Sequence, residues 1–158
     1  MKIRAAVLVT SDRRSRGEGQ DESGEMAVRL LGGVAEILEK RIVPDEPEQI
    51  REVILAWWDK GVDLVLTIGG TGLGPRDVTA VVTRSLIEKE AGGITTALLI
   101  QGLQTTPRAM LTGAVAGVRG RTLIINLPGS PAAVELYVKY LLDVLPHAVD
   151  MIRGGKHD

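Results

Sequence analysis

The sequence of 158 residues contains no cysteine and no phenylalanine, and its aromatic residues are two tryptophans and two tyrosines. Without cysteine the chain has no disulfide, no thiolate metal site and no cysteine nucleophile. The shortage of aromatic rings argues against recognition of nucleic acid by base stacking. The hydrophobic core must therefore be built from Val, Leu, Ile and Ala.

An excess of charge of one sign is also missing, because 19 basic residues face 20 acidic ones and the net charge is −1. A near-neutral chain lacks the general basic field with which many proteins bind nucleic acid. No apolar run approaches the roughly 20 residues that span a bilayer, and the N-terminus lacks the apolar core of a signal peptide. We therefore expect no nucleic acid or membrane partner, and a cytoplasmic location.

Apolar strand patterns alternate with helical patterns along the chain. Strands are predicted at 3–10, 35–43, 62–67 and 122–127, with helices that begin near Ser23, Glu46, Val78, Ser130 and Pro146. Residues 91–120 predict a helix over 94–103 and a hairpin-like pair around 109–118. Continuous apolar strands separated by helices indicate a parallel sheet covered on both faces. We expect an α/β fold, a three-layer α/β/α sandwich with a mostly parallel sheet, in one domain over residues 1–158.

The most informative segment runs from Ile68 to Thr79 with the sequence IGGTGLGPRDVT. Its glycines leave the backbone free to turn sharply and to approach a ligand closely, and N–H groups in such a loop can cradle phosphate oxygens. Arg76 adds a fork of donors and Asp77 a hard oxygen ligand. A glycine-rich turn between a strand and a helix is typical of phosphate sites in open α/β sheets. The alternative is a plain strand-to-helix connection.

Three further loops follow predicted strands, and ligands in such sheets bind beyond the carboxyl ends of the strands. The first, residues 10–24, is long for its class, and its Arg13, Arg14 and Arg16 predict phosphate binding unless the loop is simply solvated. The last, residues 126–134, has Ser130 at a helix N-cap and offers a second anion site.

The remaining loop carries Asp45, which together with Asp77 predicts a divalent cation site, because Mg²⁺ is usually held by one or two carboxylates plus substrate phosphates. Helix capping is a sufficient alternative for both side chains. Asp45 and Glu48 have capping-box spacing, and Asp77 precedes the helix expected at Val78.

Taken together, the four loops resemble the molybdopterin adenylyltransferase family of molybdenum-cofactor biosynthesis, over about residues 3–154. The motifs that carry the resemblance are Ser11-Asp12-Arg13 with Asp21, Ser23 and Gly24; Pro44-Asp45-Glu46; Gly69-Gly70-Thr71-Gly72 with Pro75-Arg76-Asp77-Val78-Thr79; and Ile125-Asn126-Leu127-Pro128-Gly129-Ser130-Pro131.

The resemblance implies a molybdopterin-binding-like fold and the transfer of AMP from Mg-ATP to the terminal phosphate of molybdopterin, with release of pyrophosphate. It implies Mg²⁺ as cofactor, ATP and molybdopterin as substrates, a homotrimer, and a molybdate-insertion protein as a candidate partner. Asp45 and Asp77 are the expected catalytic residues and metal ligands. The expected substrate-binding residues are Thr10, Ser11, Asp12, Ser23, Gly24, Gly69, Gly70, Thr71, Gly72, Arg76, Thr112, Pro128, Gly129 and Ser130.

The sequence departs from the family pattern on the side expected to bind the pterin. Leu111-Thr112-Gly113 stands where the family usually has Leu-Ser-Arg, and residues 95–102 are mostly apolar where the family helix bears Glu, Arg and Ser. These departures favour an alternative, a non-catalytic molybdopterin-binding or scaffold paralogue. A third interpretation is the related domain of molybdate-insertion and competence-type proteins, for whose extra domains this chain is too short.

Overall fold

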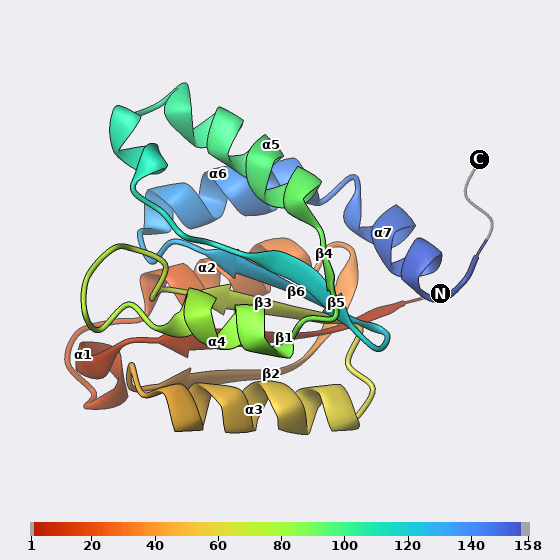
Figure 1. The fold of residues 1–158 in the computed structure, drawn as a ribbon, viewed down its shortest axis with the longest axis horizontal. Coiled ribbons are helices and arrows are strands. Elements are labelled where there is room, and N and C mark those ends of the chain that lie inside the picture. The colour runs from red at the N-terminus through yellow and green to blue at the C-terminus, as the bar shows by residue number, and fades with distance from the viewer. Residues whose placement is uncertain (1, 156–158) are drawn as a thin grey trace.

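The computed structural model of the protein describes residues 2–155. In that range the chain forms a six-stranded sheet in the order β2-β1-β3-β6-β5-β4 (Figure 1). The strands are β1 (Ile3–Thr10), β2 (Ala35–Val43), β3 (Leu64–Ile68), β4 (Lys89–Glu90), β5 (Ala116–Arg119) and β6 (Thr122–Leu127). β2, β1, β3 and β6 run parallel, whereas β5 pairs antiparallel with β6 and with β4. The predicted mostly parallel α/β sheet is confirmed.

Helices cover both faces of this sheet (Figure 1). They are α1 (Asp12–Ser15), α2 (Glu22–Leu31), α3 (Pro47–Asp59), α4 (Thr79–Leu86), α5 (Gly92–Leu103), α6 (Pro131–Leu141) and α7 (Leu145–Ile152), with a 3₁₀ helix, η1 (Pro107–Met110). Side chains alternate between the two faces along a strand, and β1 follows this rule. Ala5 and Val7 pack with α2 and α6, whereas Ala6 and Leu8 pack with α3 and α4.

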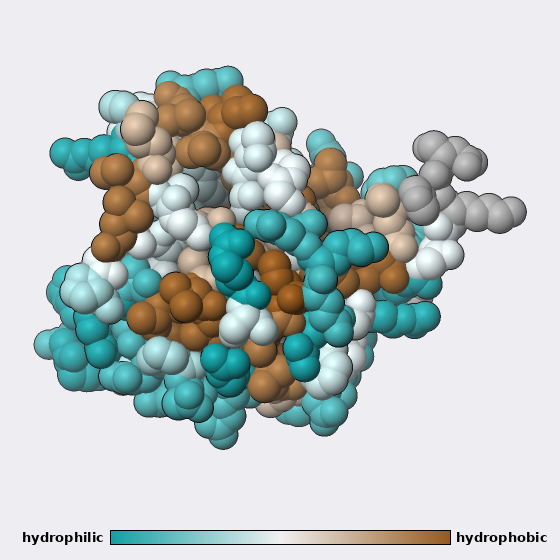
Figure 2. Space-filling view, viewed as in Figure 1, coloured by the Kyte–Doolittle hydropathy of each residue, from teal (hydrophilic) through white to brown (hydrophobic). Residues whose placement is uncertain are grey.

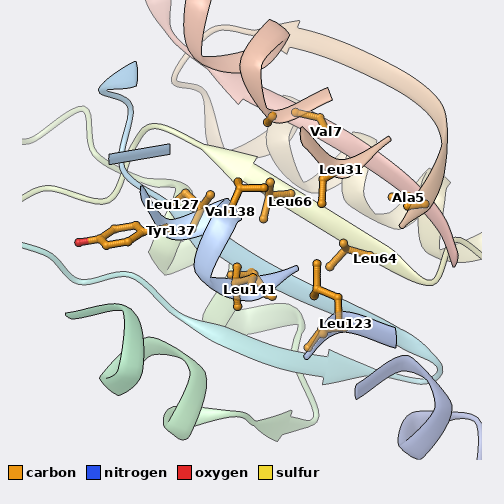
Figure 3. Close-up of a cluster of buried hydrophobic side chains, with 14 of the residues drawn as sticks. Ala5, Val7, Leu31, Leu64, Leu66, Leu123, Leu127, Tyr137, Val138 and Leu141 are labelled. Atoms are coloured by element: carbon orange, nitrogen blue, oxygen red, sulfur yellow. The ribbon is translucent and has the colours of Figure 1, made fainter. Parts of the chain in front are cut away.

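The larger core cluster lies between the sheet and the layer of α2, α5, α6 and α7 (Figure 3). In Figure 3, Leu64 and Leu66 of β3 point toward Val138 and Leu141 of α6, and the Tyr137 ring extends away from the cluster. The cluster consists of aliphatic side chains apart from Tyr137. This composition agrees with the expectation from the sequence that aliphatic residues must build the core.

Three details of the predicted fold are wrong. Residues 109–118 do not form a hairpin, because residues 107–110 form η1 and the hairpin joins β5 to β6 through Gly120, whose φ is +56°. The short strand β4 was not predicted at all, and β3 begins two residues later than expected and ends one later. Strand pairing at these positions depends on residues that are distant in the sequence, and local sequence patterns do not predict it.

Candidate functional site

The four predicted loops lie side by side at one edge of the sheet, because β2, β1, β3 and β6 are parallel neighbours and all end there (Figure 1). Each loop enters a helix on the far side of the turn. In the structure these loops are residues 44–46 after β2, residue 11 after β1, residues 69–78 after β3 and residues 128–130 after β6. The long loop predicted at residues 10–24 is wrong in part, because α1 occupies Asp12–Ser15 and α2 begins at Glu22. Sequence segments far apart in the chain therefore surround one region.

The loop after β3 requires glycine at its first two positions. Gly69 and Gly70 have φ values of +100° and +69°, a region that residues with a side chain rarely adopt. A Cβ on Gly69 would lie 2.5 Å from the carbonyl oxygen of Thr10, and one on Gly70 would collide with the hydroxyl of Thr79. The fold therefore requires that the backbone at Gly69 and Gly70 carries no side chains.

Buried hydroxyl groups hold this turn from behind. Thr79 is 0% exposed, and its Oγ1 lies 2.8 Å from Oγ1 of Thr10 at the end of β1. The N–H of Thr79 donates to the carbonyl of Gly70 at 3.1 Å. The start of α4 is thereby bonded both to Gly70 and to the end of β1.

A second buried polar group, Asn126 of β6, fixes α4 against the sheet. Its Nδ2 donates to Oγ1 of Thr67 at 2.8 Å and to Oγ1 of Thr83 at 2.9 Å. Its Oδ1 accepts from the N–H of Val115 at 3.0 Å. A buried amide with all these partners stabilises one arrangement of the strand and helix, and so sets the direction in which the loop before α4 leaves the sheet.

Asp12 and Asp45 bind each other's backbone across the ends of β1 and β2. The N–H of Asp12 donates to Oδ2 of Asp45, and the N–H of Asp45 donates to Oδ1 of Asp12, each at 3.0 Å. The two carboxylates consequently lie close together. Two like charges in proximity require compensation.

Arg76 supplies part of that compensation for Asp12. Its Nε and Nη2 contact Oδ2 and Oδ1 of Asp12 at 3.1 and 2.9 Å, and Nη2 also contacts Oε1 of Glu46 at 2.9 Å. The Arg76 side chain is 54% exposed. This cluster joins the loops after β1, β2 and β3 at the surface.

The electrostatics of the two aspartates differ. The hydrogen bond from Arg76, followed by the backbone N–H of Asp45, lowers the pKa of Asp12 below its ordinary value. Burial raises the pKa of Asp45, and the charges of Asp12 and Asp77 add to that rise against the opposing Asp12 N–H and Arg76. Asp45 is therefore a partly buried carboxylate, with like charges nearby, whose ionised form a cation would stabilise.

Asp45 and Asp77 are carboxylates at the same edge of the sheet, and their chemistry suits a hard cation such as Mg²⁺. Both supply hard carboxylate oxygens, and the charge of Asp77 adds to the rise in the pKa of Asp45. Among residues 2–155, no group of three or more His, Cys, Asp and Glu side chains could hold a metal by itself. A pair of carboxylates without a complete protein cage is the arrangement that Mg²⁺ uses with phosphate substrates.

Two pockets open at this edge of the sheet. The large pocket, of about 690 Å³, lies between the glycine loop and the layer of α5, η1 and α6, and the small pocket, of about 300 Å³, lies beside α1 and α2. Gly69 and Gly129 line both pockets. Figure 2 shows the surface hollowed between the part formed by α5 and the body of the molecule.

Most of the predicted substrate-binding residues line one of these pockets. The large pocket has Gly69, Gly70, Thr71, Gly72, Thr112, Pro128, Gly129 and Ser130, together with Asp77. The small pocket has Thr10, Ser11, Ser23, Gly69 and Gly129, together with Arg13 and Arg14. Arg16 lines neither and instead pairs with Glu18. Phosphate binding by Arg13 and Arg14 remains a prediction.

Four predicted residues line neither pocket: Asp12, Gly24, Asp45 and Arg76. Asp12, Asp45 and Arg76 form the surface cluster at the strand ends described above. Gly24 lies in the first turn of α2, where its N–H donates to Oδ1 of Asp21 at 2.9 Å. Its contact is thus with the cap of the helix.

The capping alternative is wrong for both aspartates. Glu46, not Asp45, is the N-cap residue of α3, and no side chain caps that helix. Val78 is the N-cap of α4, also without a side-chain cap, and the Asp77 carboxylate accepts instead from the N–H of Gly74 at 2.9 Å. Ser130 does cap α6, accepting from the N–H of Ala133 at 3.2 Å.

Sequence reasoning missed one wall of the large pocket. Residues on this wall that were not predicted include Arg108, Leu111, Leu136 and Tyr137. Burial raises the pKa of the Tyr137 hydroxyl. A signal was available on α6, since Ala133, Leu136 and Tyr137 follow the N-cap at spacings that place them on one helix face.

Comparison with known structures and sequences identifies the class of proteins that share this fold. The fold is that of molybdopterin biosynthesis proteins: the molybdopterin biosynthesis enzyme MoaB from Thermus thermophilus is similar with a TM-score of 0.89 and 45% identity, over 99% of each chain. The family described as "Probable molybdopterin binding domain" matches residues 6–147, and this chain belongs to that family.

Two curated relatives differ in how much of their length this chain covers. A molybdopterin adenylyltransferase from Helicobacter pylori (strain J99) is 35% identical over 97% of this chain and 89% of its own length. Gephyrin from Dictyostelium discoideum is 39% identical over 94% of this chain and only 22% of its own length. The same domain thus occurs in relatives of similar length and within much longer ones.

Proposed function

We propose that this protein transfers AMP from Mg-ATP to the terminal phosphate of molybdopterin and releases pyrophosphate. The observation that carries the proposal is the glycine turn at Gly69 and Gly70, which adjoins both the large pocket and Asp77. The similarity to the Helicobacter pylori molybdopterin adenylyltransferase over most of both chains supports this activity.

The proposed reaction is a displacement at phosphorus. An oxygen of the molybdopterin phosphate attacks the α-phosphorus of ATP, a new P–O–P linkage forms, and the bond between the α-phosphorus and the bridging oxygen to the β-phosphate breaks. The electron pair leaves with pyrophosphate. Because the substrate itself provides the nucleophile, catalysis consists chiefly of positioning and charge neutralisation.

The residues divide these tasks. Asp45 and Asp77 would hold Mg²⁺, which when bound neutralises phosphate charge and orients the transferred group. The turn at residues 69–72 cradles phosphate oxygens with its backbone. Leu111, Leu136 and Tyr137 give the large pocket an apolar wall suited to a flat heterocycle.

Pyrophosphate release from Mg-ATP, measured with and without molybdopterin, tests the proposal. The wild type should release pyrophosphate only when molybdopterin is present. Asp77→Asn and Asp45→Asn should each reduce the rate at least about 100-fold, because each removes a charged metal ligand. Asp77→Asn keeps an oxygen that accepts from the N–H of Gly74, so it removes charge with little change of loop structure.

Asp59→Asn is the matched control, since Asp59 is an exposed carboxylate at the last residue of α3, far from the strand ends where α3 begins. It should retain the wild-type rate. Binding of molybdopterin by the wild type without any release of pyrophosphate would contradict the proposed transfer. That result would assign the chain to the non-catalytic molybdopterin-binding alternative.

We also propose that the protein is a cytoplasmic homotrimer and delivers its product to a molybdate-insertion protein. No helix within residues 2–155 is long and apolar enough to cross a membrane. An apolar groove of about 610 Å³, lined by Ile94, Ala97, Tyr140, Val144 and Met151 among others, supports self-association. Light scattering on the purified chain measures the oligomeric state, and a monomer would contradict this part of the proposal.

A further inference from the structure

The large pocket contains one positive side chain. Among the residues that line it, Arg108 is the only cation and Asp77 the only anion, and the others are glycines, hydroxyl-bearing residues, proline and apolar residues. A ligand that carries a phosphate and enters this pocket therefore meets one candidate cationic side chain on its walls. Arg108 is therefore the candidate partner for a phosphate group in this pocket.

Arg108 is also available to bind. Its backbone is fixed, because its N–H donates to Oγ1 of Thr106 at 3.2 Å within the N-cap of η1. Its guanidinium, in contrast, makes no hydrogen bond or ion pair with any residue between 2 and 155. Arg76 and Arg153 differ in this respect, since carboxylates already hold both.

The position of Arg108 suits an elongated ligand. η1 follows α5, and the glycine loop follows β3, so the two segments approach the pocket from different layers of the sandwich (Figure 1). Apolar and hydroxyl side chains, including Leu136 and Thr112, line the same pocket. A flat ring with a phosphate matches walls of this composition.

We propose that Arg108 binds a phosphate group of the ligand that occupies the large pocket. A guanidinium presents a planar fork of donors that contacts two phosphate oxygens at once. This inference rests on the proposed function, whose two substrates, ATP and molybdopterin, both carry phosphate.

Binding measurements with the neutral variant Arg108→Met test the inference. Methionine keeps an apolar stem of similar reach, so the change removes charge and hydrogen bonding rather than packing. We expect about a tenfold weaker affinity for ATP, for molybdopterin or for both, since a tenfold change is at the lower end of what a charge-assisted hydrogen bond contributes. Loss for ATP alone identifies a nucleotide phosphate, and loss for molybdopterin alone identifies the pterin phosphate.

Two controls accompany this measurement. Adenosine, which lacks phosphate, should bind Arg108→Met as it binds the wild type. Arg121→Met removes an exposed arginine that lies just before β6 begins, at the opposite end of that strand from the site, and should leave every affinity unchanged.

Unchanged affinity of Arg108→Met for both phosphorylated ligands overturns the inference, as does an equal loss for adenosine or a wild type that binds neither phosphorylated ligand. The outcomes also separate this inference from the proposed function. Weaker ATP binding by the variant, in a protein that releases no pyrophosphate, would support Arg108 and contradict the transfer. AMP transfer with identical KM values in the variant and the wild type would support the proposed function and contradict phosphate binding by Arg108.

Discussion

The parallel strands carry a charged cluster at each end, and the two clusters differ in exposure. At the amino ends, Asp63 is 6% exposed, accepts from the N–H of Arg4 at 2.9 Å and pairs with Arg153 at 2.5 Å. At the carboxyl ends, Asp12 pairs with an Arg76 side chain that is 54% exposed. Asp45, beside Asp12, has no ion pair among residues 2–155.

This difference separates a cluster that holds the fold from one that can bind a ligand. A buried carboxylate with its own cation and backbone donor has nothing left to offer a ligand, and its loss exposes unpaired groups. An exposed cluster contributes little to stability. Burial raises the pKa of Asp45, and this carboxylate has no ion pair among residues 2–155. Changes at the two ends should therefore affect different properties.

Replacement of Asp63 by alanine should have the largest effect on stability. It removes the carboxylate partner of the partly buried Arg153 guanidinium and of the Arg4 N–H, so we expect a loss of about 3 kcal/mol in the free energy of unfolding. Denaturant unfolding measures this loss. Glu46→Ala, which breaks the exposed pair with Arg76 in the carboxyl-end cluster, should cost less than about 1 kcal/mol. Equal costs for the two variants would remove the distinction between the clusters.

Replacement of Gly70 by alanine should have an intermediate effect at the carboxyl edge. The positive φ and the collision with Thr79 should together cost about 1–3 kcal/mol of stability and weaken ATP binding, because the turn must move. Gly92→Ala is the control, since its added Cβ would meet nothing within 4 Å and its φ is not positive. Thermal unfolding and ATP titration of both variants measure the effect. If alanine at position 70 changed neither the stability nor the ATP affinity, the proposed phosphate-binding turn at Gly69 and Gly70 would be contradicted.

The pH dependence of stability should show the smallest effect. The pKa of Asp45 is raised in the folded protein from 3.8, so its contribution to stability is present below that value and is lost as the pH rises through the raised pKa. Asp45→Asn should therefore become more stable than the wild type as the pH rises through this range, by less than about 1 kcal/mol because solvent screens the site. Unfolding of both proteins across acidic pH measures the difference. A variant that instead loses stability relative to the wild type as the pH rises would contradict the raised pKa.

Local sequence patterns predicted the strands well where one strand carries a long apolar run. The bounds of β1, β2 and β6 match the expected ranges. β1 and β6 are largely apolar runs that end at polar loops, a pattern typical of buried strands. The region around β5 was misread, since Ala116 and Gly117 have little strand preference and depend on pairing with β6. Such pairing is a tertiary property.

Part of the candidate site was likewise predicted from the sequence, and part was missed. The glycine loop and the carboxylates were found because strand ends converge in a parallel sheet, which is a rule of topology. The capping interpretation competed with them because the N–H of Asp12, the actual partner of Asp45, lies 33 positions away in the sequence. The wall with Arg108 and Tyr137 was missed because it depends on the packing of η1 and α5 near α6. There a side chain at Gly102 would collide with the Tyr137 hydroxyl.

The partition between the two pockets has a consequence for how this protein can change over evolution. Gly69 and Gly129 line both pockets, and a Cβ on Gly129 would rest at an ordinary contact distance of 3.6 Å from Cα of Gly69. The partition is thus thin backbone that a single methyl group would thicken without disturbing the fold. A change of Gly129 to alanine would therefore add one methyl group to the wall that the two pockets share, and so separate the spaces on its two sides further.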